Sequence, residues 1–178
     1  MLAPLTTARL ALRAITTDDV DLIVDLDADP EVMRFINGGR PTPREEAARI
    51  VERSQGHRWV AFERDGGGFV GWFGLRPSGP HQRELGYRLR RAFWGRGLAT
   101  EGSLALIELA FTQLDVRRVW AQTMTVNTAS RAVMERCGMR CVRTFHLEWP
   151  EPIAGTEHGD VEYELTAAEW ESAPRSDT

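Results

Sequence analysis

The residues with the clearest capacity for chemistry are the glycines of RAFWGRGLATEG, which spans residues 91–102. Gly95 and Gly97 flank an arginine, and because neither has a Cβ, a ligand can approach the backbone closely. The residues that follow begin a helix, whose first N–H groups have no internal partner and whose dipole adds partial positive charge. The glycine turn and the helix start together predict a binding site for a phosphate-type anion.

A strand and a helix must position this turn. Before it, Leu85, Tyr87 and Leu89 alternate with polar residues and glycine, which is the period of a strand over 84–90. After it, residues 98–114 are apolar on most sides, which predicts a largely buried helix. A strand–helix–strand unit through this turn is expected to be parallel and right-handed.

The rest of the chain divides into short alternating elements. Strands are predicted at 9–15, 59–63, 69–75, 119–126, 139–147 and 160–165. Helices are predicted at 17–27, 30–35, 44–55 and 128–137, and loops at 77–80 and 150–159. The tail after Trp170 is expected to be frayed. Since the middle hairpins are antiparallel, the prediction is an α/β fold: a mixed, mostly antiparallel sheet with helices on both faces.

Length and composition limit the domain number, the classes of binding partner and the compartment that can be expected for this chain. The 178 residues contain no repeat or linker and predict one domain over 1–178. A net charge of −4 argues against a general nucleic-acid surface, and no apolar stretch reaches the ~20 residues of a membrane span. All 22 basic residues are arginine. The four histidines are scattered, so no metal site is expected. Without a signal-peptide pattern and with only two cysteines, the chain is expected to be cytoplasmic.

Three ligands compete for the glycine turn. A dinucleotide fold would require a third glycine where Thr100 stands, and the strand before the turn is not the first of the chain. A P-loop would require a lysine, which the sequence lacks. The third candidate is the pyrophosphate of coenzyme A.

The segment WGRGLATEG, preceded by ELGYRL, resembles the GNAT (GCN5-related) N-acetyltransferases, and most of all the branch with the ribosomal-protein N-terminal acetyltransferases. Gly97 and Ala99 match the small positions of the family motif, and Trp94 replaces its leading Gln/Arg, as is usual in that branch. NTASRAVMERCGM, at 127–139, is similar to a second family segment. The resemblance implies a fold in which two central parallel strands splay apart around acetyl-CoA.

The resemblance also implies cofactor contacts. Backbone of Tyr87, Arg88 and Leu89 would face the pantetheine arm and the acetyl group. The pyrophosphate would be bound by backbone N–H groups of Trp94, Gly95, Arg96, Gly97, Leu98, Ala99 and Thr100. Arg96 would add a charge-assisted bond. Asn127 would contact the cofactor arm, although a helix N-cap explains this residue as well.

The implied reaction is direct attack of a primary amine on the acetyl-CoA thioester, with neither Cys137 nor Cys141 required. Ser130 is the candidate for protonating the leaving thiolate, and first-turn capping is the alternative role. Glu84 is the candidate base or water-ordering group, and a solvated strand-end carboxylate is the alternative. Glu148 and Tyr163 are rivals for the base.

The acceptor is expected to be an amine, and a cationic amine would be attracted by the carboxylates that occur in both regions flanking the acceptor groove of the resembled fold. These are Asp25, Asp27, Asp29, Glu31, Glu148, Glu151, Glu157 and Asp160. Ordinary solvated surface is the other explanation. The alternative functions are a non-catalytic acetyl-CoA-binding sensor or regulatory module and a nucleotide-binding protein. A homodimer is plausible for the branch.

Overall fold

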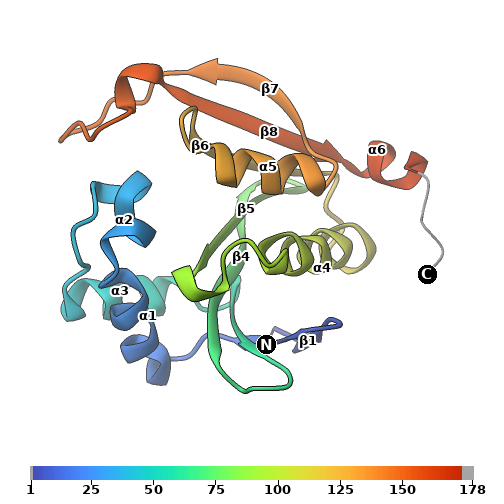
Figure 1. Ribbon diagram of the computed structural model, residues 1–178. Helices are drawn as coiled ribbons and strands as arrows, with labels where there is room; N and C mark the ends of the chain where they lie inside the picture. Colours follow the sequence, from blue (N-terminus) through green and yellow to red (C-terminus); the bar gives the residue numbers. More distant parts are fainter. Residues whose placement is uncertain (1, 174–178) are drawn as a thin grey trace.

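The computed structural model describes residues 2–173 and contains one eight-stranded sheet (Figure 1). The strands are β1 Leu5–Thr6, β2 Leu10–Ala14, β3 Arg58–Glu63, β4 Phe69–Gly79, β5 Gln82–Leu89, β6 Arg118–Met124, β7 Arg140–Phe145 and β8 Asp160–Thr166. Their order in the sheet is β1-β2-β3-β4-β5-β6-β8-β7. Within the described residues β5 and β6 are the one parallel pair.

Six α-helices connect these strands across the described residues. They are α1 Val20–Asp27, α2 Pro30–Asn37, α3 Arg44–Ser54, α4 Leu98–Gln113, α5 Thr128–Arg136 and α6 Ala167–Ser172. Local chemistry sets several of their ends: the Asp29 side chain caps α2, and Gly38 ends it in a left-handed conformation. None of these helices is long and apolar enough to cross a membrane.

Helices cover both faces of the sheet, and each face has its own apolar core. On one face Ile23, Leu26 and Val51 of α1 and α3 pack against strand residues such as Val60. On the other face α4 and α5 form the larger core with residues such as Leu106, Ile107, Phe73 and Met134. The predicted mixed sheet with helices on both faces is confirmed.

Helix α4 lies very close to the sheet because Gly102 faces the ring of Phe73. A Cβ at Gly102 would lie 2.3 Å from that ring. The glycine therefore lets the helix that follows the glycine turn pack directly on β4.

The central strands separate as the expected fold requires. β5 and β6 pair over Gln82–Glu84 and Arg118–Trp120. Beyond Glu84, β5 continues to Leu89 with β4 as its partner, while β6 continues beside β8. Among residues 2–173, the edge of β5 that faces β6 therefore has no strand partner over its last residues.

Three local predictions were wrong. Residues 77–80 are not a loop, because β4 continues to Gly79 and pairs with β5. Pro77 is tolerated there because β3 pairs with β4 only up to Gly74, so no neighbouring strand requires the N–H that proline lacks. The short strand β1 was missed. The chain stays helical to Ser172, since Thr166 and Glu169 form a capping box; the predicted frayed tail beyond 173 lies outside the described residues.

Candidate active site

The glycine turn, residues 94–97, presents a row of free backbone donors. Gly95 and Gly97 have φ angles of 70° and 77°, a left-handed conformation that side chains disfavour. Within the described residues, no N–H from Gly95 to Thr100 has a hydrogen-bond acceptor, and the first helical bond runs from Glu101 N–H to Gly97 O at 3.0 Å. Successive unpaired N–H groups at a helix N-terminus form an anion site.

Glu101 ties this turn to the start of the chain. Its carboxylate accepts hydrogen bonds from Thr7 Oγ1 at 2.6 Å, from Arg9 N–H at 2.8 Å and from Arg9 Nε at 2.6 Å. Arg9 also donates to the Arg96 carbonyl at 2.8 Å. Partial burial opposes ionisation, but the bonds from Thr7 and Arg9 lower the pKa of Glu101 below its ordinary value. The turn is thus held from outside by an ionised carboxylate.

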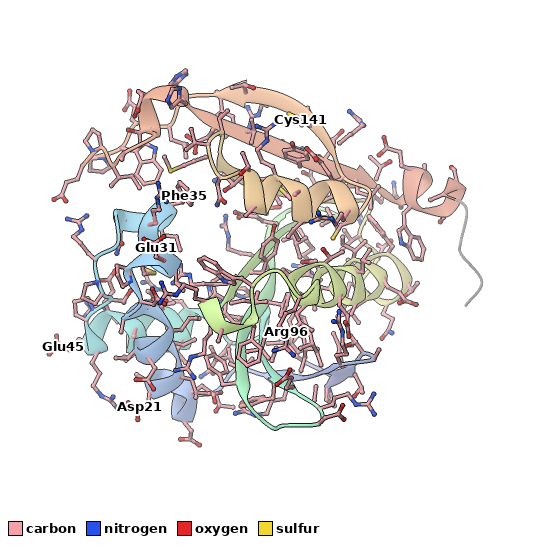
Figure 2. The ribbon with its side chains drawn as sticks, viewed as in Figure 1. Asp21, Glu31, Phe35, Glu45, Arg96 and Cys141 are labelled. Atoms are coloured by element: carbon pink, nitrogen blue, oxygen red, sulfur yellow. The ribbon has the colours of Figure 1, made fainter. Side chains whose placement is uncertain are left out.

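The side chains of the turn have protein partners of their own. Arg96 is labelled in Figure 2. It forms an ion pair with Glu63 and lies 5.3 Å from the centroid of the Phe93 ring. Trp94 donates from Nε1 to the Leu89 carbonyl at 2.8 Å. To bind a phosphate, the Arg96 side chain would have to give up its ion pair with Glu63. The backbone N–H groups of the turn would need no such change.

The predicted pantetheine contacts, residues 87–89, lie on the part of β5 beyond its pairing with β6. Arg90 N–H donates to Val70 O on β4 at 2.9 Å. Because backbone groups alternate between the two neighbours of a strand, those of Leu89 and Tyr87 point away from β4 and toward the separated side. By the same alternation, the backbone groups of Arg88 point toward β4.

Tyr87 and Ser130 meet across the separation. The Tyr87 hydroxyl donates to the Ser130 carbonyl at 3.1 Å and lies 3.0 Å from Ser130 Oγ. Burial raises the pKa of Tyr87, so the phenol stays protonated. Asn127 caps α5 by accepting from Ser130 N–H at 3.3 Å, and its amide donates to Thr123 Oγ1 at 3.0 Å. Asn127 is therefore the N-cap of α5, which is the alternative role given above.

Glu84 stands at the fork where β5 and β6 separate. It is the last β5 residue paired with β6, opposite Trp120. Arg76, its cross-strand neighbour on β4, forms an ion pair with Glu84 Oε2. The other oxygen, Oε1, has no hydrogen-bond donor among residues 2–173. The carboxylate is thus anchored by one oxygen and can accept a proton or order a water with the other.

The two rival bases have other surroundings. Tyr163 lies on the opposite face of the sheet, where its hydroxyl donates to Glu135 at 2.7 Å. Glu148 is exposed in the segment after β7. Burial raises the pKa of Cys137 to about 12, which makes it a poor nucleophile. Cys141 is exposed on β7 (Figure 2).

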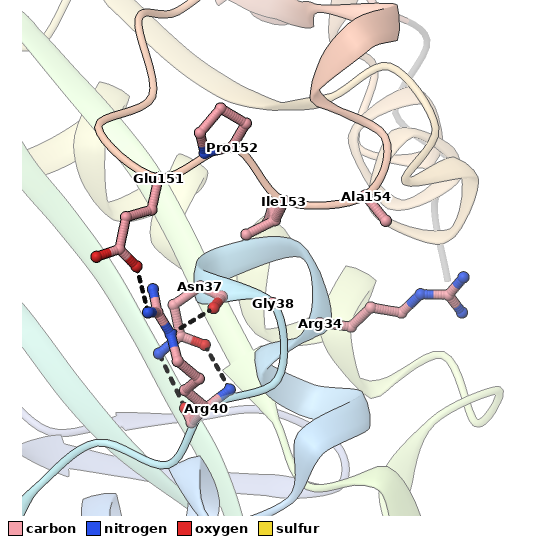
Figure 3. A pocket seen from close by; sticks show the side chains of 8 residues that line it. All are labelled: Arg34, Asn37, Gly38, Arg40, Glu151, Pro152, Ile153 and Ala154. Carbon is pink, nitrogen blue, oxygen red and sulfur yellow. Dashed lines mark hydrogen bonds and ion pairs between the residues drawn. The ribbon is translucent and has the colours of Figure 1, made fainter.

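Several carboxylates of the predicted acidic rim are buried or paired with arginine. Asp27 and Asp160 are buried, with 1% and 3% of their surfaces exposed. Glu151 forms an ion pair with Arg40, which joins the segment after β7 to the end of α2 (Figure 3). A pocket of about 340 Å³ lies there, and two of its lining residues are arginines, Arg34 and Arg40.

Comparison with known proteins shows the family of this chain. The model of the acetyltransferase (GNAT) domain matches residues 9–140. FsC-acetyl coenzyme A-N(2)-transacetylase of Aspergillus fumigatus is 37% identical over 92% of this chain and 76% of its own. A solved GNAT-family acetyltransferase from Bacillus anthracis has a TM-score of 0.80 at 21% identity, covering 93% of this chain and 99% of that one.

A second solved structure has a similar fold. It is a RimL ribosomal L7/L12 alpha-N-protein acetyltransferase in complex with coenzyme A, with a TM-score of 0.78 at 20% identity, covering 92% of this chain and 98% of that one. The chain belongs to the GNAT acetyltransferase family and is an acyltransferase. Family membership implies acetyl-CoA as the acetyl donor, and the free N–H groups from Gly95 to Thr100 fit its pyrophosphate.

Two side-chain contacts of the candidate site were not predicted from the sequence. Nothing in one sequence shows that the Tyr87 hydroxyl meets Ser130. The contacts of Glu101 could have been anticipated, because it is a charged residue near the start of a helix that is otherwise largely apolar. Such a charge requires a partner when it is partly buried.

Proposed function

We propose that this protein is an acetyl-CoA-dependent N-acetyltransferase that transfers the acetyl group directly to a primary amine. The observation that carries the proposal is the row of free N–H groups from Gly95 to Thr100 beside the unpaired edge of β5. The name of the Aspergillus fumigatus relative, an N(2)-transacetylase, also supports a nitrogen acceptor. The acceptor is a protein N-terminus or a small-molecule amine.

Glu84 is the proposed base. Acetyl-CoA supplies an acetyl group activated as a thioester. The amine nitrogen attacks the thioester carbonyl, so a C–N bond forms and the C–S bond breaks. The proton that the ammonium must lose passes to Glu84 Oε1, directly or through a water, because Arg76 holds only the other oxygen.

Ser130 is the proposed proton donor to the leaving thiolate. Its hydroxyl is 3.0 Å from that of Tyr87, whose phenol is neutral and therefore remains a donor. In this arrangement the base lies on one face of the sheet and the acid on the other. The two proton transfers are therefore served by separate groups.

The test is a titration with acetyl-CoA by calorimetry, with ATP and NAD as controls, followed by an assay of free thiol release with a panel of amines. Glu84→Gln is expected to lower kcat at least tenfold with acetyl-CoA affinity unchanged. Glu45→Gln, an exposed change on α3, is the matched control and should be neutral.

Each contrary result identifies a different failure. No acetyl-CoA binding would overturn the assignment of the glycine turn. Binding without turnover on any amine would favour the acetyl-CoA sensor instead. Turnover that Glu84→Gln leaves unchanged would remove Glu84 from the mechanism but leave the transferase intact.

A further inference from the structure

Two arginines on the α1–α3 face of the sheet contact the same tryptophan. The Arg58 guanidinium lies 3.9 Å from the Trp72 ring centroid, and that of Arg88 lies 5.4 Å from it. Asp27 pairs with Arg88 Nη1 and also accepts from Thr42 Oγ1 at 2.7 Å. Within residues 2–173 the Arg58 side chain has neither an ion pair nor a hydrogen-bond acceptor. The cluster therefore holds two cations for one carboxylate.

The free donors of Arg88 have the arrangement that a carboxylate recognises. Nε and Nη2 lie on one edge of the guanidinium, and in the described part of the chain neither has an acceptor. Nε is fully buried, whereas Nη2 is not sealed from solvent. Such an edge donates two parallel hydrogen bonds to a carboxylate. A buried donor without a partner is costly, so a ligand that supplies the acceptor gains binding energy.

Trp72 adds to the same surface. Its Nε1 is a second buried donor in this cluster that has no acceptor among the described residues. Burial, and the charge of Arg88 nearby, lower the pKa of Arg58 to about 10, which shows how little the protein itself compensates the second cation. Arginine stacked on an aromatic ring remains available at its edge for hydrogen bonding.

This cluster lies beside the proposed base. A Cβ at Gly86 would lie 3.5 Å from the Trp72 ring, so the ring extends over the residue between Arg88 and Glu84. Alternate residues of a strand share a face, which places Arg88, Gly86 and Glu84 in one row along β5. A small molecule along this row would have one end at Glu84 and the other at Arg88.

We propose that Arg58 and Arg88 bind a carboxylate carried by the amine acceptor, which makes amino-acid-like molecules the substrate class. The inference rests on the proposed function, since the amine of that acceptor must reach Glu84. It replaces a purely cationic acceptor with one that carries a carboxylate in addition to its amine. Desolvation of the cluster strengthens this charge recognition.

The test compares acids with their amides. Glycine, β-alanine and γ-aminobutyrate place the carboxylate at increasing distance from the amine, and each is assayed beside its carboxamide. At least one acid is expected to exceed its amide in kcat/KM at least tenfold. Arg58→Gln should remove that preference by lowering the acid alone, and Arg58→Lys, which keeps the charge but not the planar donors, should retain part of it.

A matched control and a binding measurement complete the test. Arg143→Gln removes a cation that lies 4.7 Å from the Phe145 ring at the far edge of the sheet, and it should keep the preference. Bound acid should also raise the Tm of the CoA-loaded wild type but not of Arg58→Gln. Acetyl-CoA binding by each variant shows that it is folded.

The outcomes separate the two proposals. If acids and amides are used equally, or if no acid raises the Tm of the wild type, the carboxylate inference is overturned. This holds whether or not the panel turns over. If acetyl-CoA itself neither binds nor donates to any amine, the proposed function fails first.

Discussion

The Tyr87 hydroxyl makes both of its contacts with a single residue, Ser130, and the two residues come from β5 and α5. Tyr87→Phe removes the hydroxyl and leaves the ring in the core. Because one hydrogen bond contributes about 0.5–1.5 kcal/mol, we expect kcat to fall roughly threefold to tenfold with acetyl-CoA affinity unchanged. Steady-state kinetics with saturating acetyl-CoA measure this.

The double variant provides the control for Tyr87. If Tyr87 acts by positioning Ser130, adding Tyr87→Phe to Ser130→Ala should cost almost nothing further. Fully additive losses would show that the tyrosine acts independently of the serine.

Gly97 is a second position where a single substitution is expected to change the behaviour of the site, here its affinity for acetyl-CoA. Its φ of 77° disfavours a branched side chain, and a Cβ there would lie 3.4 Å from Nη2 of Arg9, the residue that holds the turn through the Arg96 carbonyl, so the substitution would distort the row of free N–H groups. Gly97→Val is expected to lower acetyl-CoA affinity at least tenfold while the fold survives. Gly67→Val, at φ 65° in the β3–β4 turn with open space around it, applies similar backbone strain away from the site. Equal losses in both variants would point to general destabilisation.

At the scale of elements, arginine and glutamate side chains join the last strands. Arg118 of β6 donates to Glu162 at 2.6 Å and to Glu164 at 2.7 Å, both on β8. Arg143 and Arg140 of β7 donate to the same two carboxylates. Burial opposes ionisation of Glu162, but its bonds to Arg143 and Arg118 lower its pKa below the ordinary value. These ion pairs hold β6, β8 and β7 together on the face opposite α5.

The lowered pKa of Glu162 predicts acid sensitivity. A carboxylate whose pKa is depressed by folding stabilises the protein above its ordinary pKa of 4.5, and this stabilisation is lost as pH falls through the lowered value. Glu162→Gln should therefore cost about 1–2 kcal/mol at pH 7 and flatten the decline in Tm below pH 4.5. Thermal unfolding between pH 7 and 3 tests this, with exposed Glu52→Gln as control. An unchanged acid profile would exclude Glu162 as a source of the sensitivity.

Most elements were predictable because their signals are local. The strand before the glycine turn, the buried helix after it and the Asn127 cap all follow from a few neighbouring residues. Pro77 was misread as a loop signal because its tolerance depends on where β3 stops pairing, which lies far away in sequence. The capping box of α6 was readable from Thr166 and Glu169 but was overlooked.

For the whole molecule, acetyl-CoA is expected to act as a folding ligand. At ~100-fold excess over Kd, binding to the native state alone adds ~2.7 kcal/mol to the free energy of unfolding. For a chain of this length that corresponds to a rise in Tm of roughly 5–10 °C. A thermal scan with acetyl-CoA, with NAD at the same concentration as control, measures it. An equal rise with NAD would show that binding is not selective.

Contacts that depend on the arrangement of the whole molecule could not be predicted from the sequence. The position of Glu84 beside Arg76, and of Asp27 beside Arg88, depends on strand register and on how α1 packs on the sheet. Asp27 was grouped with surface acids because a single sequence does not reveal that a distant arginine reaches it. The candidate site residues were proposed from sequence motifs, whereas the side chains that contact them in the structure were not predicted.

The short parallel seam between β5 and β6 has a consequence for isotope labelling. Amide protons in the centre of a sheet normally exchange with solvent slowly because neighbouring strands hold them. Beyond Glu84 the β6 side of β5 lacks that protection, so Tyr87 and Leu89 have exchangeable amides in the middle of the fold. Deuterium uptake at these two residues therefore reports whether anything occupies the space between the strands, without any assay of turnover.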